Sequence, residues 1–160
     1  MADDPRQWLE SVKHAGVRAK VRTGGTAADA FPTAAQLARF IVRCAELGVP
    51  FKATAGLHHP LRGEQKLTYA ADSPSATMFG FVNVFLAGAF ARAGMDERTI
   101  ARLLEERDAA AITFGDDAVR WRRHAIMLDE LRDARASFAL AFGSCSFREP
   151  IDDLHRLALL

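Results

Sequence analysis

Hydrophobic and polar residues alternate in two short segments, residues 17–22 and 49–55, and each segment runs into a glycine turn. A period of two is typical of a β-strand, because successive side chains point to opposite faces. In the first segment the alternation places Lys20 and Arg22 on one face and alanine and valine on the other. The second segment carries Lys52 inside an apolar run. We therefore predict two strands with one lysine each.

A helical pattern of apolar residues lies between the two strands. Four positions recur at spacings of three or four: Leu37, Phe40, Ile41 and Cys44. One face of this helix therefore packs on a core, and Cys44 belongs to that face. Thr33 and Gln36 fit a capping box at its start, and Gly48 fits a C-terminal cap. A strand–helix–strand unit of this length predicts parallel strands joined by a right-handed crossover.

The rest of the chain is predicted to be mainly helical. The expected helices span residues 4–14, 76–93, 97–107 and 125–136, and a last helix opens at Pro150 with Ile151, Leu154 and Leu157 on its inner face. The helix at 76–93 is apolar nearly all round, which is typical of a helix buried on several sides. Its polar exception, Asn83, either faces a site or bonds to neighbouring backbone.

Three segments have a less regular pattern. Residues 63–75 are polar and predict a loop that would cover a site. Residues 111–121 fit either a hairpin around a Gly-Asp-Asp turn or a helix that begins near Asp117. Residues 138–142 are a small apolar run, which fits a strand or a helix extension.

Composition limits the class of protein. A length of 160 residues with 49% hydrophobic content predicts a single α/β domain over residues 1–160 with a substantial core. The formal net charge of +1 gives no basic field that would favour nucleic acid. No apolar run reaches the length of a membrane span, and the polar N-terminus is unlike a signal peptide. Two cysteines do not make a disulfide framework, so we expect a cytoplasmic protein. From its charge and its apolar runs we expect no nucleic-acid partner and no membrane partner.

Lysine is rare in this chain, which contains only Lys13, Lys20, Lys52 and Lys66 against many arginines. A desolvated lysine can lose its proton near neutral pH, whereas arginine cannot. A cation within an apolar strand is also costly. The lysines of the two strands are therefore either reactive groups or ordinary side chains that reach solvent or pair with acids.

Histidines and serines supply further candidate chemistry. One of His58 and His59 is expected to act as a polar or acid–base group, and the other to stabilise its loop. The pair would bind a metal only with a third ligand such as His124 or Cys145, and no zinc spacing is present, so we expect no metal and no other cofactor. His14 and His155 lie on predicted helices at the surface.

A small polar loop precedes the last predicted helix. It contains Gly143, Ser144, Cys145 and Ser146. Hydroxyls and free N–H groups before a helix N-terminus suit an anion, although an ordinary capping turn has the same residue types.

Three motifs now stand in order along the chain: Lys20-Val21-Arg22-Thr23-Gly24-Gly25, Lys52-Ala53-Thr54-Ala55-Gly56 and Phe142-Gly143-Ser144-Cys145-Ser146. Together they resemble the last three strand motifs of the deoxyribose-phosphate aldolase family, class I aldolases with a (β/α)8 barrel. The segment from Lys52 to Pro60 is also similar to one in an uncharacterised bacterial family, which implies no activity.

The resemblance implies roles for individual residues. Lys20 would be the Schiff-base lysine, and Lys52 the neighbouring cation that depresses its pKa. The phosphate pocket would be lined by glycines and serines: Gly24, Gly25, Gly56, Gly143, Ser144 and Ser146. We add as ligand contacts the polar residues beside these motifs: Arg22, Thr23, Thr54, His59 and Arg62, with His58 as an acid–base group.

The chain departs from the family in three ways. Residues 57–62 replace a glycine and an arginine that follow directly in the family. The long separation of the second and third motifs implies a mostly helical insertion at about 76–135. The chain is also too short for a barrel of about 250 residues. We therefore expect an α/β fold built like the C-terminal half of a TIM-barrel-like (β/α) barrel, completed by a second copy or by a missing N-terminal half.

The expected function is that of a Schiff-base-forming, aldolase-like lyase, or half of one, acting on a small phosphorylated aldehyde or sugar. The alternatives are a domain that binds a phosphate or carboxylate ligand without covalent chemistry, and an inactive partial barrel.

Overall fold

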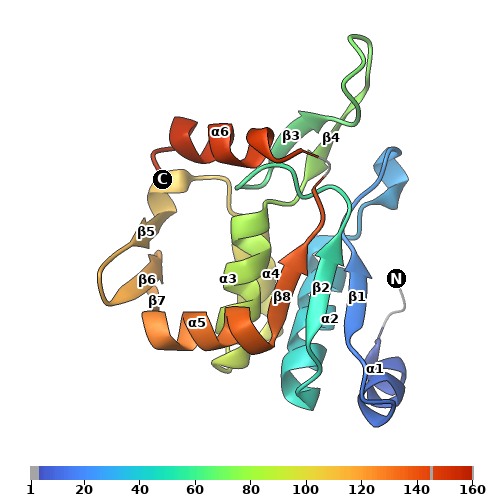
Figure 1. Cartoon of the computed structure of the whole chain (residues 1–160), viewed down its shortest axis with the longest axis vertical. Helices are drawn as coiled ribbons and strands as arrows, with labels where there is room; N and C mark the ends of the chain where they lie inside the picture. Colours follow the sequence, from blue (N-terminus) through green and yellow to red (C-terminus); the bar gives the residue numbers. More distant parts are fainter. Residues whose placement is uncertain (1–3, 145, 160) are drawn as a thin grey trace.

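The described residues contain one three-stranded parallel sheet, which lies to the right of the centre in Figure 1. The computed structural model describes residues 4–144 and 146–159. The strands are β1 (Ala19–Arg22), β2 (Phe51–Thr54) and β8 (Ala139–Phe142), in the order β1-β2-β8. The prediction of parallel strands flanking a helix is confirmed, and the run at 138–142 supplies the third strand. The described chain is thus a mixed α/β fold whose sheets do not close into a barrel.

The helices of the described residues are α1 (Arg6–His14), α2 (Ala34–Leu47), α3 (Phe81–Arg92), α4 (Glu97–Leu104), α5 (Leu128–Ser137) and α6 (Arg148–Arg156), with short 3-10 turns at Ala28–Ala30 and Ala109–Ala111. The predicted capping box of α2 is present, because Thr33 and Gln36 bond each other's backbone N–H groups. Gly48 ends this helix at φ 67°, a left-handed conformation that glycine adopts without strain. These local signals fix both ends of α2.

Two small antiparallel sheets correct parts of the sequence prediction. β3 (Gly63–Lys66) pairs with β4 (Ser75–Met78), so residues 63–75 are not wholly a loop and the helix expected from residue 76 begins only at Phe81. β5 (Ile112–Phe114), β6 (Ala118–Trp121) and β7 (His124–Met127) form a meander. The hairpin alternative for residues 111–121 is therefore correct, whereas residues 124–127, expected to be mostly helical, are a strand.

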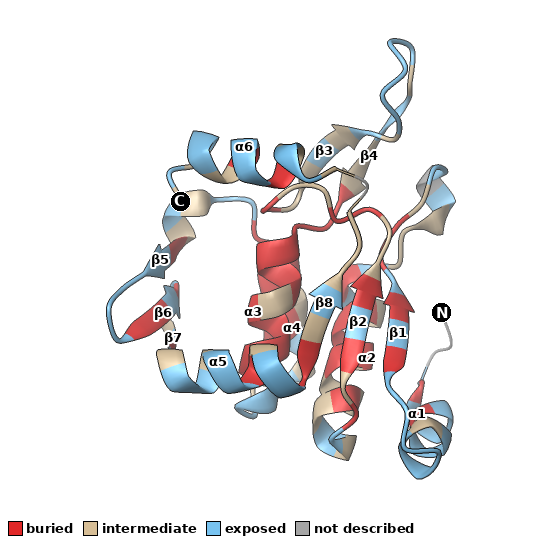
Figure 2. Ribbon diagram, in the orientation of Figure 1, coloured by how far each residue is buried: buried red, intermediate tan, exposed pale blue. Residues whose placement is uncertain are grey.

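The core lies between the sheet and the helices α2 and α3. The ring of Phe51 on β2 meets Phe40 of α2 edge-on at 5.7 Å and Phe138 at 5.2 Å between ring centroids. Gly88 lets α3 approach β8, because a Cβ there would lie 2.9 Å from that of Ala139. Figure 2 shows α3 buried along nearly its whole length, as its apolar sequence predicts. Cys44 is fully buried in this core, as expected, and burial raises the pKa of its thiol.

Asn83 ties three segments together from within α3. Its side-chain oxygen accepts the Arg62 N–H at 2.9 Å, and its amide donates to the carbonyls of Leu103 and Glu106 at 2.9 and 3.0 Å. The side chain is completely buried. Asn83 therefore bonds to backbone, which is the structural alternative for this residue.

We expect the substitution Asn83→Leu to lower the free energy of unfolding by about 3 kcal/mol, because the Arg62 N–H and the Glu106 carbonyl lose their partner and the Leu103 carbonyl keeps only the Glu106 N–H. Urea denaturation at pH 7 measures this change. Gln7→Leu, at an exposed position of α1, is the control and should stay within about 0.5 kcal/mol of the parent. Equal stabilities of the Asn83→Leu variant and the parent would contradict the role of Asn83.

Glu106 is a buried carboxylate that four donors satisfy. Its oxygens accept from the Trp121 indole, the Arg122 guanidinium and the N–H groups of Arg107 and Asp108, at 2.7–3.1 Å. Burial alone would raise the pKa of Glu106, but the hydrogen bonds from Arg122 and Trp121 outweigh it and the pKa lies below its usual value. The carboxylate thus anchors β6 to the end of α4.

Because the folded-state pKa of Glu106 is depressed, its stabilisation is present above the unfolded pKa of about 4.3 and is lost as pH falls through the folded value. We expect Glu106→Gln to lose about 2 kcal/mol at pH 7 and progressively less in acid. Urea unfolding at pH 7 and pH 3 measures the difference, with the exposed Glu105→Gln as the control. A deficit that stays the same at both pH values would argue against an ionised Glu106.

Candidate functional site

Two lysines lie side by side on one face of the parallel sheet. Lys20 of β1 and Lys52 of β2 are register partners in adjacent strands, and both side chains are exposed. Their neighbours Val21 and Ala53 are buried on the opposite face. The predicted alternation is therefore confirmed, and both lysines reach solvent because the lysine face of the sheet is open.

Arg22 extends the same basic face toward the carboxyl end of β1. Its Nε donates to the carbonyl of Gly24 at 2.9 Å, which fixes the guanidinium beside the turn. Among the described residues, no acid lies within ion-pair distance of Lys20, Arg22 or Lys52. We call these three residues the basic face.

A broad cavity of about 720 Å³ opens beside β1. Lys20 and Arg22 contribute to its wall, together with Trp8 of α1, Phe31 and Asp29. Aromatic surface and two cations thus border one hollow, with Asp4 and Asp29 as opposing charges. Such a lining suits a small molecule that carries charged groups and an apolar part.

The strand ends of β1 and β2 are locked to each other by small residues. The hydroxyl of Thr23 donates to the carbonyl of Ala55 at 2.6 Å and contacts that of Thr54 at 3.3 Å. Gly24 lies beneath the Phe31 ring, and Gly56, at φ 73°, packs on the Gly24 backbone. Thr23, Gly24 and Gly56 are buried, so this contact explains their residue types without a ligand. The predicted ligand residues Gly25 and Thr54 are half-buried at the same turn.

The chain then bends sharply into the two histidines. Ala55 has φ 66°, which is uncommon for a residue with a Cβ, and Gly56 follows with φ 73°. This double left-handed turn carries the chain from the sheet to residues 57–59. Backbone strain of this kind is found at functional sites more often than elsewhere.

His58 and His59 meet two carboxylates of α6. Nδ1 of His59 lies 2.5 Å from Oδ2 of Asp153, and its Nε2 lies 4.0 Å from Oε1 of Glu149. Nδ1 of His58 lies 3.4 Å from Oε2 of Glu149. All four side chains are at least 70% buried. We call this group the histidine–carboxylate cluster.

Ser144 contacts the histidine–carboxylate cluster without completing a catalytic triad. Its hydroxyl oxygen lies 3.3 Å from Nδ1 of His58, the same nitrogen that faces Glu149. In a serine–histidine–carboxylate triad the serine and the acid use opposite ring nitrogens. His58 therefore cannot relay a proton between Ser144 and Glu149 in this arrangement.

The loop before α6 satisfies its own donors. The Ser146 N–H donates to the Ser144 hydroxyl, the Glu149 N–H donates to the Ser146 hydroxyl, and the Gly143 N–H donates to Ala53. Cys145, between the two serines, lies outside the described residues. The geometry is that of a capping turn, and the predicted anion contacts of Gly143, Ser144 and Ser146 stay a prediction.

The structure places Arg62 apart from the basic face. Its guanidinium lies over the Phe79 ring, 4.6 Å from the centroid, and Nη1 is buried without a hydrogen-bond partner. Burial lowers the pKa of Arg62. The Arg62 side chain thus packs on the aromatic core, and its predicted contact with a ligand stays a prediction.

The remaining histidines do not join the cluster. His124 stacks on Trp121 in the β5–β7 sheet, with ring centroids 5.4 Å apart, while His14 and His155 are exposed on helices, as expected. Over residues 4–144 and 146–159 no group of three histidine, cysteine, aspartate or glutamate side chains is arranged to hold a metal ion.

Sequence reasoning missed the acidic half of the histidine–carboxylate cluster. Glu149 and Asp153 are four residues apart on α6, and Asp153 is buried, whereas Ile151, expected on the inner face, is 48% exposed. The sequence signal for this cluster was Asp153, an acid on the inner face of a short helix where an apolar residue is expected. Tyr69 also went unnoticed; its hydroxyl donates to Glu149 at 3.1 Å.

Comparison with known proteins gives no relative. No protein-family model, no curated protein and no solved structure matches this chain. Within the part of the chain that the structure describes, no helix has both the length and the apolar composition to cross a membrane.

We expect Thr23→Val to lower the free energy of unfolding by about 1–2 kcal/mol, because the Ala55 carbonyl loses the donor that the buried Thr23 supplies. Urea denaturation measures the effect, with Thr26→Val, exposed in the same loop, as a control that should change little. Unchanged stability of Thr23→Val would mean that this hydrogen bond does not hold the strand ends together.

Proposed function

We propose that the basic face binds a small phosphorylated aldehyde or sugar and that Lys20 forms a Schiff base with its carbonyl group. The observation that carries the proposal is the register of Lys20 and Lys52, which places the two lysines directly beside each other on neighbouring strands whose backbones lie about 5 Å apart. One amine can attack a carbonyl while the second cation and Arg22 attract the phosphate. The resemblance to the aldolase motifs also implies that Lys20 is the Schiff-base lysine.

The architecture supports a partial (β/α) barrel as the setting for this chemistry. Helices α2 and α3 cover one face of the parallel sheet, as the outer helices of a barrel do, while the basic face corresponds to the barrel interior. Parallel sheets are normally covered on both faces, so an open one calls for a second body. We propose that a second copy of the chain or a separate N-terminal half covers it.

Binding without covalent chemistry is the second candidate function. It is favoured by the exposure of both lysines, because an exposed ammonium group is a good charge clamp. Phosphate or carboxylate ligands would then be held by Lys20, Arg22 and Lys52 together.

The experiment for the Schiff base is reductive trapping. The protein is treated with borohydride and, in separate samples, with acetaldehyde, dihydroxyacetone phosphate and glyceraldehyde 3-phosphate, and adducts are located by peptide mass mapping. We expect an adduct at Lys20 that is absent from Lys20→Arg and retained in Lys13→Arg, whose lysine lies on α1. Equal labelling of Lys13 and Lys20 would sink the covalent proposal.

Non-covalent binding predicts that phosphate stabilises the protein without any need for the Lys20 amine. At a phosphate concentration tenfold above Kd, the thermal midpoint should rise by about 3–5 °C. The shift should survive Lys20→Arg, which keeps the charge, and disappear in the double variant Arg22→Met, Lys52→Met. A shift that persists in the double variant would place the anion elsewhere.

A further inference from the structure

The histidine–carboxylate cluster contains one histidine with a defined orientation. Nδ1 of His59 lies 2.5 Å from Oδ2 of Asp153, whose other oxygen pairs with Arg156 at 2.9 Å. The side chains of His59 and Asp153 are 14% and 11% exposed. A carboxylate in this position accepts the Nδ1 proton and fixes the ring plane, so the basic lone pair of a neutral imidazole resides on Nε2.

The free side of that imidazole faces a carboxylate across a gap. Nε2 of His59 lies 4.0 Å from Oε1 of Glu149, which is too long for a hydrogen bond. The second oxygen of Glu149 is occupied, because it accepts from the Tyr69 hydroxyl and faces His58. A base and a hydrogen-bond acceptor thus lie side by side, close enough for one ligand beside them to contact both.

The gap belongs to a cavity of about 350 Å³ between α6 and the β3–β4 hairpin. Its lining is mainly polar: His58, His59, Gln65, Lys66, Thr68, Tyr69 and Glu149. Amide, hydroxyl and carboxylate groups in this mixture suit a small hydroxylated molecule. This cavity shares no lining residue with the one beside Lys20 and Arg22.

We infer that this cavity is a proton-transfer site for a small α-hydroxycarbonyl compound, with His59 as the base, Asp153 as its positioning residue and Glu149 as the acceptor of the ligand hydroxyl. The C–H bond beside the carbonyl breaks, its proton goes to Nε2 of His59, and its electron pair moves onto the carbonyl oxygen. Return of a proton to the same carbon regenerates the compound, so no oxidant or reductant takes part. This inference is independent of Schiff-base formation at Lys20.

The charged and polar groups around His59 come from three elements. Asp153, Arg156 and Glu149 are on α6, His58 is on the same loop as His59, and Lys66 and Tyr69 belong to the β3–β4 hairpin. Two carboxylates, one guanidinium and the ammonium group of Lys66 therefore border the two imidazoles. An imidazolium formed during proton transfer would have a carboxylate on each side.

Solvent exchange tests the inference directly. Glycolaldehyde, dihydroxyacetone and D-glyceraldehyde, with dihydroxyacetone phosphate as a fourth probe, are incubated with the protein in D2O, and loss of the α-proton signal is followed by NMR. We expect exchange above the buffer rate that falls about 100-fold in His59→Gln and about tenfold in Asp153→Asn. His155→Gln, an exposed histidine of α6, should exchange like the parent.

A Schiff base also promotes this exchange, so Lys20→Arg separates the two proposals. Exchange that is lost in Lys20→Arg and kept in His59→Gln would overturn the inference and support the lysine site. Exchange that is lost in His59→Gln and kept in Lys20→Arg supports the inference whatever the fate of the Schiff base. No exchange above buffer with any of the four probes would overturn it.

A spectroscopic readout covers the case in which Asp153→Asn does not fold. Long-range proton–nitrogen NMR of the parent should show His59 with its proton on Nδ1 at neutral pH, and a proton on Nε2 would overturn the inference. Glu149→Gln removes a partly exposed carboxylate and should lower the exchange rate about tenfold while this tautomer is kept. An unchanged rate would remove Glu149 from its role.

Discussion

Burial of one face of a three-stranded sheet is the constraint on which the rest of the structure depends. Phe51 lies in the central strand and meets Phe40, Phe138 and the α3 segment around Gly88. Because side chains alternate along a strand, burying Phe51 and Ala53 forces Lys52 to the other side. A slip of one residue would place the lysine in the aromatic core, at a cost of several kcal/mol. The core thus determines where the basic face lies.

Local signals made the first third of the fold predictable. The alternation of β1, the capping box at Thr33 and the left-handed cap at Gly48 each act within a few residues, so a sequence reading finds them. β3 was missed because Gly-Glu-Gln-Lys has no apolar alternation, and backbone pairing with β4 alone makes it a strand. At β7 the apolar residues continue without a break into α5, so the sequence pattern does not show where the strand ends and the helix begins.

One candidate site could be predicted from local sequence patterns, and the other could not. Lys20 and Lys52 were found because each interrupts a short strand pattern, and the parallel pairing of those strands brings them together. The contact of His59 with Asp153 spans 94 residues and depends on the position of α6, above the upper end of α3 and beside β3 in Figure 1. No pattern within either segment encodes that position. The direction of the Arg62 side chain was not predictable either, because its contact with the Phe79 ring depends on tertiary packing.

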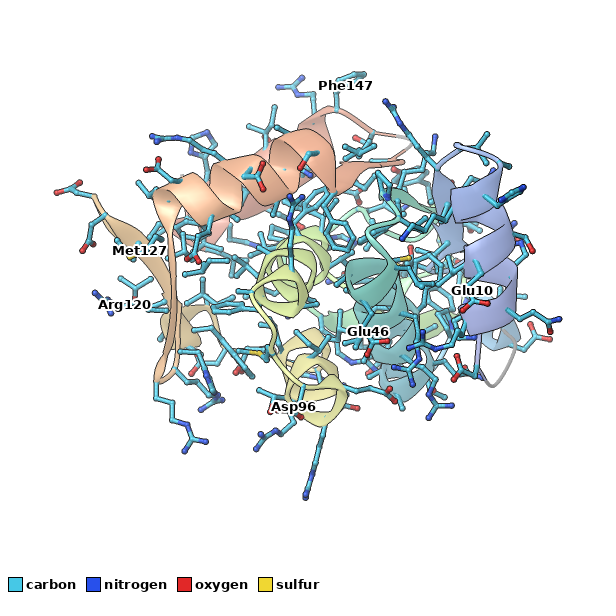
Figure 3. The ribbon with its side chains drawn as sticks, turned by 90° about the horizontal axis from the view of Figure 1, so that it is seen from below. Glu10, Glu46, Asp96, Arg120, Met127 and Phe147 are labelled. Carbon is cyan, nitrogen blue, oxygen red and sulfur yellow. The ribbon has the colours of Figure 1, made fainter. Side chains whose placement is uncertain are left out.

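Several candidate functional groups gather at one end of the parallel sheet. Phe147, at the start of α6, is 95% exposed and extends outward at the edge of the molecule in Figure 3. It stands beside the loop that carries Ser144 and Ser146, at the end of β8. The same end of the sheet therefore presents the histidine–carboxylate cluster, the serine loop and a bare aromatic ring.

The strand order β1-β2-β8 has a consequence for the growing polypeptide. The β1–α2–β2 unit leaves the ribosome well before β8, because β8 begins about 85 residues after Thr54. At ordinary elongation rates the central strand keeps an unpaired edge for on the order of ten seconds. The residue at the middle of that edge is Lys52, and a charge on such an edge discourages pairing with another nascent chain. The charge of Lys52 thus disfavours pairing of β2 with another chain until β8 has been synthesised.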